Sequence, residues 1–292
     1  MISSLRSPIY LCWSLLLLGL WLAACAPAAA AQATSLPAPS ATLPPTPSPR
    51  PTHTASATEI APLTLVFYGD SLLKVGEVGR QGQSGVSFVD ELPAYLQPNS
   101  AYTLIFANYG GRKARWAAQH LEETVLIHDP DIVTIWWGMN DLDGCPGIFD
   151  RESNRLMEYK LRAYVEEHSL AMRKQIDDLL AQDIDVFVVS AMPVLGGNLP
   201  WSHRGPNGEV IWEEGRWCHY NLGLEQLAQA QRQLAADYAA AGKAVFWVDV
   251  WELYMQNRQT ERMYMDVVHP GTQGAALIAQ AWMDAFNASG IR

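Results

Sequence analysis

The sequence predicts an α/β protein with three layers (α/β/α), in which helices cover both faces of a five-stranded parallel sheet. Short runs rich in β-branched and aromatic residues alternate with longer stretches whose apolar residues recur at helical spacing, which is the pattern of strand–helix–strand units. The chain has 292 residues with 49% hydrophobic composition, so it is long enough to bury a sizeable core. Both observations favour this class.

The expected elements follow one another in a regular order. Strands are expected over Thr64–Tyr68, Ala101–Ala107, Ile132–Trp137, Val186–Ala191 and Ala244–Val248. Helices are expected near Val86–Leu96, Ala114–Ile127, Met157–Leu180 and Leu222–Ala240, and a last one from Pro270 to about Phe286. A Gly- and Trp-rich stretch after the fourth strand shows no clear periodicity and is expected to be a loop. Right-handed crossovers between parallel strands make a flavodoxin-like topology the default.

The first 25 residues predict an export signal rather than part of the fold. One charged residue, Arg6, precedes an apolar run that is short for a membrane span, which needs about 20 residues. Leu22-Ala23-Ala24-Cys25 closes the run and resembles the lipobox of bacterial lipoproteins, which implies lipidation of Cys25. An uncleaved anchor and a plain secretory signal remain open. The expected location is extracytoplasmic, as a membrane-anchored lipoprotein or otherwise as a secreted protein.

Residues 26–62 predict a disordered tether, because they hold nine of the 18 prolines, many Ser and Thr residues and almost no charge. The folded domain is therefore expected over residues 63–292. The formal net charge of the chain is −10, and the acidic excess falls in this domain. This charge argues against nucleic acid as a partner. The membrane contact that we expect is the N-terminal lipid anchor.

Two of the four cysteines, Cys145 and Cys218, fall in the expected domain. An even pair in an exported domain favours a disulfide, with two free buried thiols as the alternative. The cysteines and histidines show no metal-binding spacing, and no cofactor motif is present. We therefore expect neither a metal nor a cofactor.

The first expected strand ends in Gly69-Asp70-Ser71, which delivers a serine to the carboxyl edge of the sheet, where ligands bind in open α/β folds. A serine needs a base to become a nucleophile at neutral pH. Among the seven histidines, His269 follows Asp266 by three residues, so the carboxylate can fold back onto the imidazole and orient it. His168 and the other histidines in helical stretches are expected to be ordinary helix residues.

Acyl transfer at a serine also needs donors for the developing oxyanion. The third strand runs into Gly138-Met139-Asn140-Asp141, where the Asn140 amide can face the sheet edge. The second strand runs into Gly110-Gly111, where a glycine amide can approach a substrate closely. Either Gly110 or Gly111 can serve in this role. Serine, glycine, asparagine and histidine therefore follow strands one, two, three and five at one edge.

These four segments resemble, in order, the signature blocks of the GDSL-type (SGNH) ester hydrolases. The resemblance implies Ser71 as nucleophile, His269 as base and Asp266 as the acid that orients the base. It also implies an oxyanion hole made by the backbone amides of Ser71 and Gly111 and the side chain of Asn140. Asp70, although it lies beside the serine, is not the implied triad acid.

The resemblance implies an esterase, and we expect it to remove short acyl groups, with O-acetyl on a carbohydrate as one substrate. The long loop is rich in tryptophan, Trp212 included, and exposed tryptophans suit stacking on sugar rings. We expect Trp137, Trp201 and Trp217 to bind substrate, with packing of the loop onto the domain as the alternative. An acyltransferase that uses the same serine and a catalytically inactive glycan-binding module are the competing functions.

Overall fold

The protein is described from a computed structural model. The structure describes residues 62–73, 87–96, 102–206, 210–257 and 261–291. The predicted signal peptide over residues 1–25, the lipidation of Cys25 and almost all of the predicted tether over residues 26–62 lie outside the described residues. No helix within the described ranges is long and apolar enough to cross a membrane.

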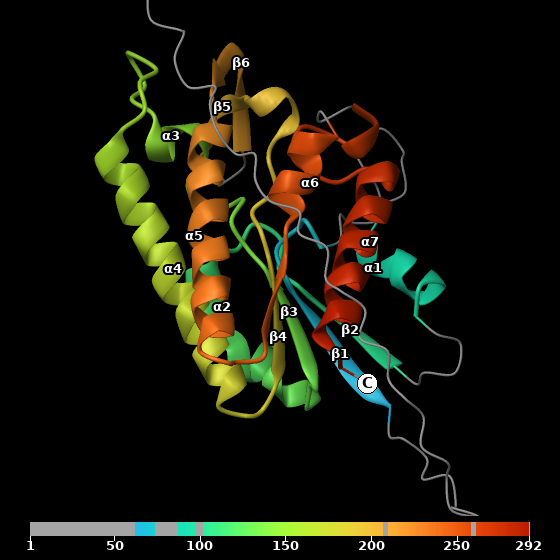
Figure 1. Cartoon of the computed structure of the whole chain (residues 1–292). Helices are drawn as coiled ribbons and strands as arrows, with labels where there is room; N and C mark the ends of the chain where they lie inside the picture. The colour runs from blue at the N-terminus through green and yellow to red at the C-terminus, as the bar shows by residue number, and fades with distance from the viewer. Residues whose placement is uncertain (1–61, 74–86, 97–101, 207–209, 258–260, 292) are drawn as a thin grey trace, which may run out of the picture. The chain divides into compact units, whose positions relative to one another are not determined.

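The centre of the domain is a five-stranded sheet in the order β2-β1-β3-β4-β7 (Figure 1). Its strands are β1 (Leu63–Gly69), β2 (Tyr102–Asn108), β3 (Ile132–Trp136), β4 (Asp185–Val189) and β7 (Val245–Val248). All four pairings are parallel. This is the flavodoxin-like order, so the predicted α/β fold is confirmed, with strand ends that differ by one or two residues.

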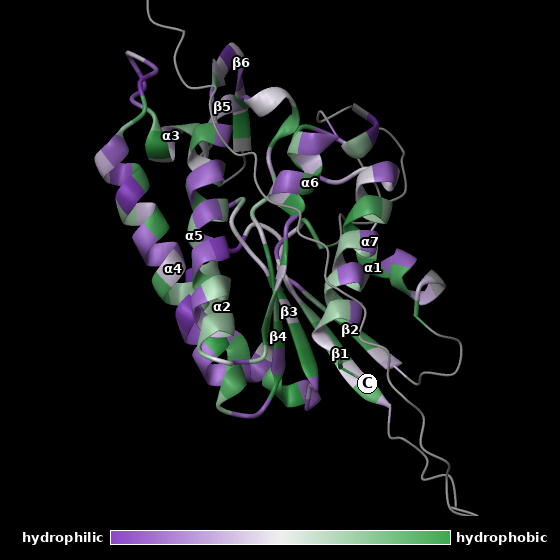
Figure 2. Cartoon of the chain, in the orientation of Figure 1, coloured by the Kyte–Doolittle hydropathy of each residue, from purple (hydrophilic) through white to green (hydrophobic). Residues whose placement is uncertain are grey.

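Helices cover both faces of this sheet (Figure 1). The helices α2 (Ala114–Thr124), α4 (Glu158–Leu180) and α5 (Asn221–Ala240) pack on one face, and α1 (Phe88–Glu91) and α7 (Thr272–Ser289) pack on the other. Figure 2 shows hydrophobic residues along the inner strands and many hydrophilic residues on α4. The inner strands β1, β3 and β4 are buried on both sides, which explains why they are almost continuously hydrophobic rather than alternating.

Several helical elements differ from the prediction. The first expected helix is only α1 followed by a 3₁₀ turn at Leu92–Ala94, which contains a proline. The last helix begins at Thr272 rather than Pro270, because Pro270 pairs with Tyr264 in an isolated bridge. Two short helices were not predicted, α3 (Gly144–Ile148) and α6 (Val250–Gln256). Further 3₁₀ turns lie at Leu126–His128, Leu195–Gly197 and Glu261–Met263.

The stretch expected to be a loop forms an antiparallel hairpin of β5 (Leu199–Arg204) and β6 (Val210–Cys218). A register shift between Pro200 and Ser202 interrupts the pairing. Such an irregularity breaks the period-2 alternation by which a strand is recognised in sequence, and this explains why the sequence indicates a loop where the structure has a hairpin.

Candidate active site

The serine lies in a tight turn at the carboxyl end of β1. The carboxylate of Asp70 accepts a hydrogen bond from the backbone amide of Leu72 at 3.0 Å, and the Leu73 amide donates to the Asp70 carbonyl at 3.1 Å. A Cβ at Gly69 would lie 2.6 Å from the carbonyl oxygen of Trp136, so only glycine fits where β1 passes the end of β3. The close packing at Gly69 and the hydrogen bond between the Asp70 carboxylate and the Leu72 amide therefore fix the backbone conformation that positions Ser71.

The structure brings Ser71, His269 and Asp266 together. The imidazole Nε2 of His269 lies 3.0 Å from Ser71 Oγ, and its Nδ1 lies 2.8 Å from Asp266 Oδ2. The other oxygen of Asp266 accepts the backbone amides of Val268 and His269, both at 2.8 Å. The local turn thus orients the carboxylate, and the carboxylate orients the ring. This is the geometry of a nucleophile, a base and an orienting acid.

The hydrogen bonds around Asp266 favour its ionised form. Partial burial raises the pKa of this carboxyl, but the His269 ring and the two backbone amides outweigh that effect and hold the pKa at about 2. The carboxylate is therefore charged at neutral pH. A charged carboxylate at Nδ1 keeps the proton of a neutral imidazole on that atom, which leaves Nε2 as an acceptor facing the serine.

Asn140 lies on the loop that follows β3, and its amide is held by the aspartate beside the serine. Its Nδ2 donates to Asp70 Oδ2 at 2.9 Å. A carboxamide nitrogen carries two hydrogens, so one N–H remains for another acceptor. When Asp70 is ionised it accepts and does not donate, so in that form the Nδ2 end of the Asn140 amide faces Asp70. No sequence pattern indicates this partnership, since the two residues lie 70 positions apart.

Asp70 itself is fully buried. Burial raises the pKa of its carboxyl to about 7, and the charge of Asp141 adds to this, although the hydrogen bonds from Leu72 and Asn140 and the charge of His269 act in the opposite direction. The value lies far above the ordinary pKa near 4 of an aspartate in an unfolded chain. Proton binding at Asp70 is therefore coupled to folding.

We expect the stability of the protein to fall as the pH rises from about 4 to about 7, by on the order of 3–4 kcal/mol from this residue. In that range the folded state keeps a proton on Asp70 that the unfolded chain has already released, so a rising pH favours unfolding. Urea unfolding of the wild type and Asp70→Asn at pH 4, 5.5, 7 and 8.5 measures this contribution. The free energy of unfolding of the wild type minus that of the variant should fall up to about pH 7 and then stay level, whereas parallel pH profiles would contradict the assignment.

Gly111 lies in the turn that follows β2, with a positive φ of 74°. The turn is closed by the Arg112 amide, which donates to the Tyr109 carbonyl at 3.1 Å. Gly111 lines the same cavity as Ser71 and Asn140, and Gly110 is not among the described residues that line it. This placement favours Gly111 of the two candidate glycines.

Ser71, Gly111, Asn140 and His269 all line one cavity of about 840 Å³. Its walls come from the loop around α3, the start of α4 and the β5–β6 hairpin. The lining residues outside the catalytic groups include Lys113, Asp143, Phe149, Arg151, Lys160, Trp201, His203, Trp212 and Glu213. Charged groups of both signs and aromatic rings share the wall, which suits a polar, uncharged ligand more than a long hydrocarbon chain.

The hairpin is attached to the rest of the cavity wall by several contacts. Cys145 and Cys218 form a disulfide with an S–S distance of 2.11 Å, linking α3 to the end of β6. The Glu213 carboxylate of β6 contacts the guanidinium of Arg151, outside the hairpin, at 2.9 Å. Asn154 Nδ2 donates to the Trp217 carbonyl at 3.1 Å. These contacts hold β6 beside the catalytic groups.

The predicted substrate-binding tryptophans fall in three different environments. Trp137 is 0% exposed in the core, where its indole donates to Gln175, so its predicted contact with substrate is wrong. Trp201 lines the cavity but is only 1% exposed and packs under Arg216. Trp217 is 49% exposed and does not line the cavity among the described residues. Trp212, which the sequence does not single out from the other tryptophans of its stretch, lines the cavity and is 43% exposed.

Comparisons with known proteins agree with this geometry. The family profile described as GDSL-like Lipase/Acylhydrolase matches residues 65–282, which is most of the chain. No curated protein matches the sequence.

Solved structures resemble the chain over most of its length. A protein described as a GDSL-like lipase from Parabacteroides merdae is 16% identical with a TM-score of 0.52, covering 77% of this chain and 95% of its own. An acetylxylan esterase from Geobacillus stearothermophilus is 17% identical with a TM-score of 0.55, covering 80% and 97%. At such identities the similarity shows a shared fold.

Proposed function

Because the chain belongs to the GDSL-like lipase/acylhydrolase family and is a carboxylic ester hydrolase, we propose that it hydrolyses short-chain esters through an acyl-enzyme on Ser71. The observation that carries this proposal is the continuous contact from Ser71 Oγ through His269 to Asp266, with distances of 3.0 and 2.8 Å. The same contact argues against an inactive binding module.

In the proposed reaction, His269 Nε2 accepts the proton of Ser71 while Oγ forms a bond to the acyl carbon. The negative charge on the former carbonyl oxygen is stabilised by the backbone amides of Ser71 and Gly111 and by the free N–H of Asn140. When the C–O bond to the alcohol breaks, His269 returns its proton to the leaving oxygen. A water molecule, deprotonated by His269, then attacks the acyl-enzyme and releases the acid and free Ser71.

A covalent label tests this mechanism directly. Diethyl 4-nitrophenyl phosphate should release one 4-nitrophenolate per protein molecule and leave a diethylphosphoryl group on the peptide that contains Ser71. Intact mass and peptide mapping measure the label, and the fall of 4-nitrophenyl acetate hydrolysis should follow its extent. Labelling of another serine, or full activity after complete labelling, would contradict the proposal.

We further propose that the alcohol part of the ester is a carbohydrate and the acyl group is acetyl. The mixed polar and aromatic wall of the cavity supports a sugar, and the similar fold of the acetylxylan esterase agrees with this substrate class. The exposed ring of Trp212 offers a flat apolar surface beside Glu213, whose carboxylate can accept hydrogen bonds from hydroxyl groups.

Trp212→Ala should raise KM for acetylated xylo-oligosaccharides about tenfold, because the loss of stacking on one ring costs about 1.5 kcal/mol. Its kcat/KM for 4-nitrophenyl acetate, which has no sugar, should stay within twofold of the wild type. Initial rates of acetate release over a range of substrate concentrations measure both constants.

Trp217→Ala is the matched control, since Trp217 lies on the same strand with similar exposure but outside the cavity wall. It should behave like the wild type on both substrates. Equal effects of the two substitutions would remove the sugar-binding role of Trp212. In the same assay, acetate that appears on added sugar rather than in solution would identify an acyltransferase.

A further inference from the structure

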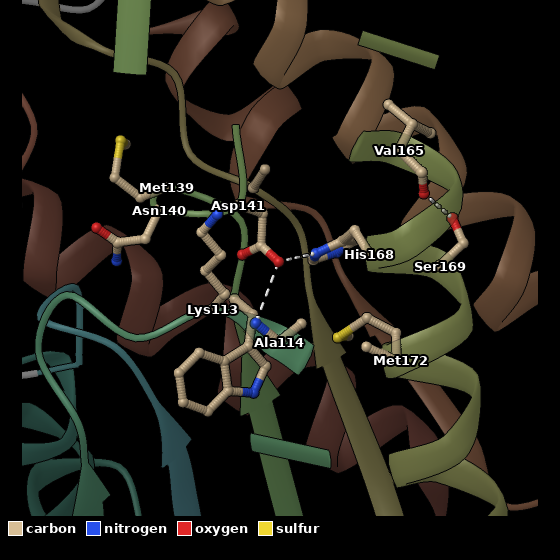
Figure 3. Close-up of polar contacts among 12 residues, drawn as sticks. Lys113, Ala114, Met139, Asn140, Asp141, Val165, His168, Ser169 and Met172 are labelled. Atoms are coloured by element: carbon tan, nitrogen blue, oxygen red, sulfur yellow. Dashed lines mark hydrogen bonds and ion pairs between the residues drawn. The ribbon is translucent and has the colours of Figure 1, made fainter. Parts of the chain in front are cut away.

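A buried carboxylate lies directly behind the proposed oxyanion hole. Asp141 follows Asn140 in the chain, and the two side chains leave the loop in different directions (Figure 3). Asp141 Oδ1 accepts a hydrogen bond from the backbone amide of Ala114 at 3.1 Å, and the Nδ1 atom of His168 lies 2.9 Å from the same oxygen. His168 projects from α4 and is fully buried, so it is not the ordinary helix residue that the sequence predicts.

Hydrogen bonds on the other side of His168 determine its tautomer. The backbone amide of Ala191 can only donate, so the side-chain oxygen of Gln231 is the atom that lies 2.6 Å from it. The side-chain nitrogen of Gln231 therefore faces the Trp137 carbonyl and His168. Gln231 Nε2 donates to the Trp137 carbonyl at 2.8 Å and lies 2.9 Å from His168 Nε2. His168 Nε2 therefore accepts a hydrogen bond from Gln231, and the ring proton of the neutral imidazole is on Nδ1, on the side of Asp141.

Asp141 thus connects the two loops from which the oxyanion donors come. Ala114 lies three residues after Gly111, and Asp141 lies one residue after Asn140. A second link between these loops, the ion pair of Lys113 and Asp143 at 2.7 Å, is partly exposed, and exposed pairs contribute little. The contacts of the buried Asp141 carboxylate with the Ala114 amide and with His168 are not screened by solvent, so they are the stronger connection between the two loops.

We propose that Asp141 and His168 are positioning residues that hold the amide of Gly111 and the side chain of Asn140 at the spacing the oxyanion requires. The proposal rests on the acyl-enzyme mechanism given above. Neither residue is placed at the reacting atoms, and no covalent step involves them. A displacement of about 1 Å in a catalytic group can cost about 10² in rate, so their effect is expected in kcat rather than in KM.

His168→Leu should lower kcat for 4-nitrophenyl acetate on the order of 10–100-fold, with KM within twofold, because Asp141 loses the partner that fixes it. His168→Asn keeps a short donor toward Asp141 and should recover most of the loss. Rates are expressed per site titrated with diethyl 4-nitrophenyl phosphate, so that unfolded protein does not count. The dissociation constant of methylboronic acid, which forms a tetrahedral anion on the serine, should rise by the same factor as kcat/KM falls.

Thr134→Val is the matched control. Thr134 on β3 accepts a buried hydrogen bond from the Trp282 indole of α7, which packs on the face of the sheet opposite to His168. The substitution should lower Tm and leave kcat per titrated site unchanged. If His168→Leu does not fold, Asp141→Asn, which keeps the size of the side chain and removes its charge, should lower kcat about three- to tenfold.

Wild-type kcat per titrated site in His168→Leu and in Asp141→Asn, as in the control Thr134→Val, would overturn the positioning role. Failure of the proposed function itself would look different, since Ser71→Ala would then retain activity.

Discussion

Ser71→Ala is expected to lower kcat for 4-nitrophenyl acetate by on the order of 10⁴–10⁶-fold and to leave the fold intact. Alanine removes only Oγ, whose hydrogen-bond partner within the described residues is the ring of His269 at 3.0 Å, so little packing is lost. Without the nucleophile no acyl-enzyme can form, and the residual rate comes from binding and the oxyanion donors alone. His269→Ala should cause a loss of similar size, because Ser71 would have no base.

The measurement is the initial rate at saturating substrate, with circular dichroism and Tm to show that each variant is folded. Ser202→Ala is a suitable control, because Ser202 lines the same cavity without a described contact to His269. It should retain activity within a few fold. The double variant Ser71→Ala/His269→Ala should be no slower than either single variant, since the two residues act as one unit. Hydrolysis near the wild-type rate by either single variant would refute the mechanism.

Asn140→Ala is expected to lower kcat about 10²–10³-fold with a small change in KM, which is the usual effect of removing one oxyanion donor. The ground-state carbonyl gains little from this donor, whereas the charged tetrahedral intermediate gains much. The substitution also removes a donor from the buried carboxyl of Asp70, so a lower Tm is expected as well.

Activity per titrated site separates the two effects of Asn140→Ala, because instability reduces the number of active molecules and not the rate of each. Asn198→Ala offers a control, since Asn198 donates to the Gly196 carbonyl at 3.2 Å and does not line the cavity. A kcat within threefold of the wild type for Asn140→Ala would remove Asn140 from the oxyanion hole.

The local parts of the site could be predicted from the sequence. Strands that end in a small polar residue point to one sheet edge in a parallel fold, so the sequence alone places Ser71 and Asn140 together. Asp266 and His269 are three residues apart, and a contact at that separation is encoded by the turn itself. Such signals are readable because each depends on neighbouring residues only.

The long-range contacts could not be predicted in this way. The hydrogen bond of Asp70 with Asn140 and the contact of Asp141 with His168 join residues on different elements, and nothing near either residue in the sequence marks its partner. The burial of Trp137, by contrast, could be predicted. Consecutive residues of a strand point to opposite faces, and both faces of this sheet are covered by helices, so neither Trp136 nor Trp137 could reach solvent.

The disulfide of Cys145 and Cys218 attaches one part of the site, the cavity wall, and leaves the catalytic triad unattached. The triad is carried by the end of β1 and the segment before α7, which the bond does not join. The disulfide instead joins two parts of the cavity wall, α3 and the β5–β6 hairpin. The triad can therefore assemble without this bond, whereas the covalent attachment of the hairpin to α3 requires an oxidant during maturation of the chain.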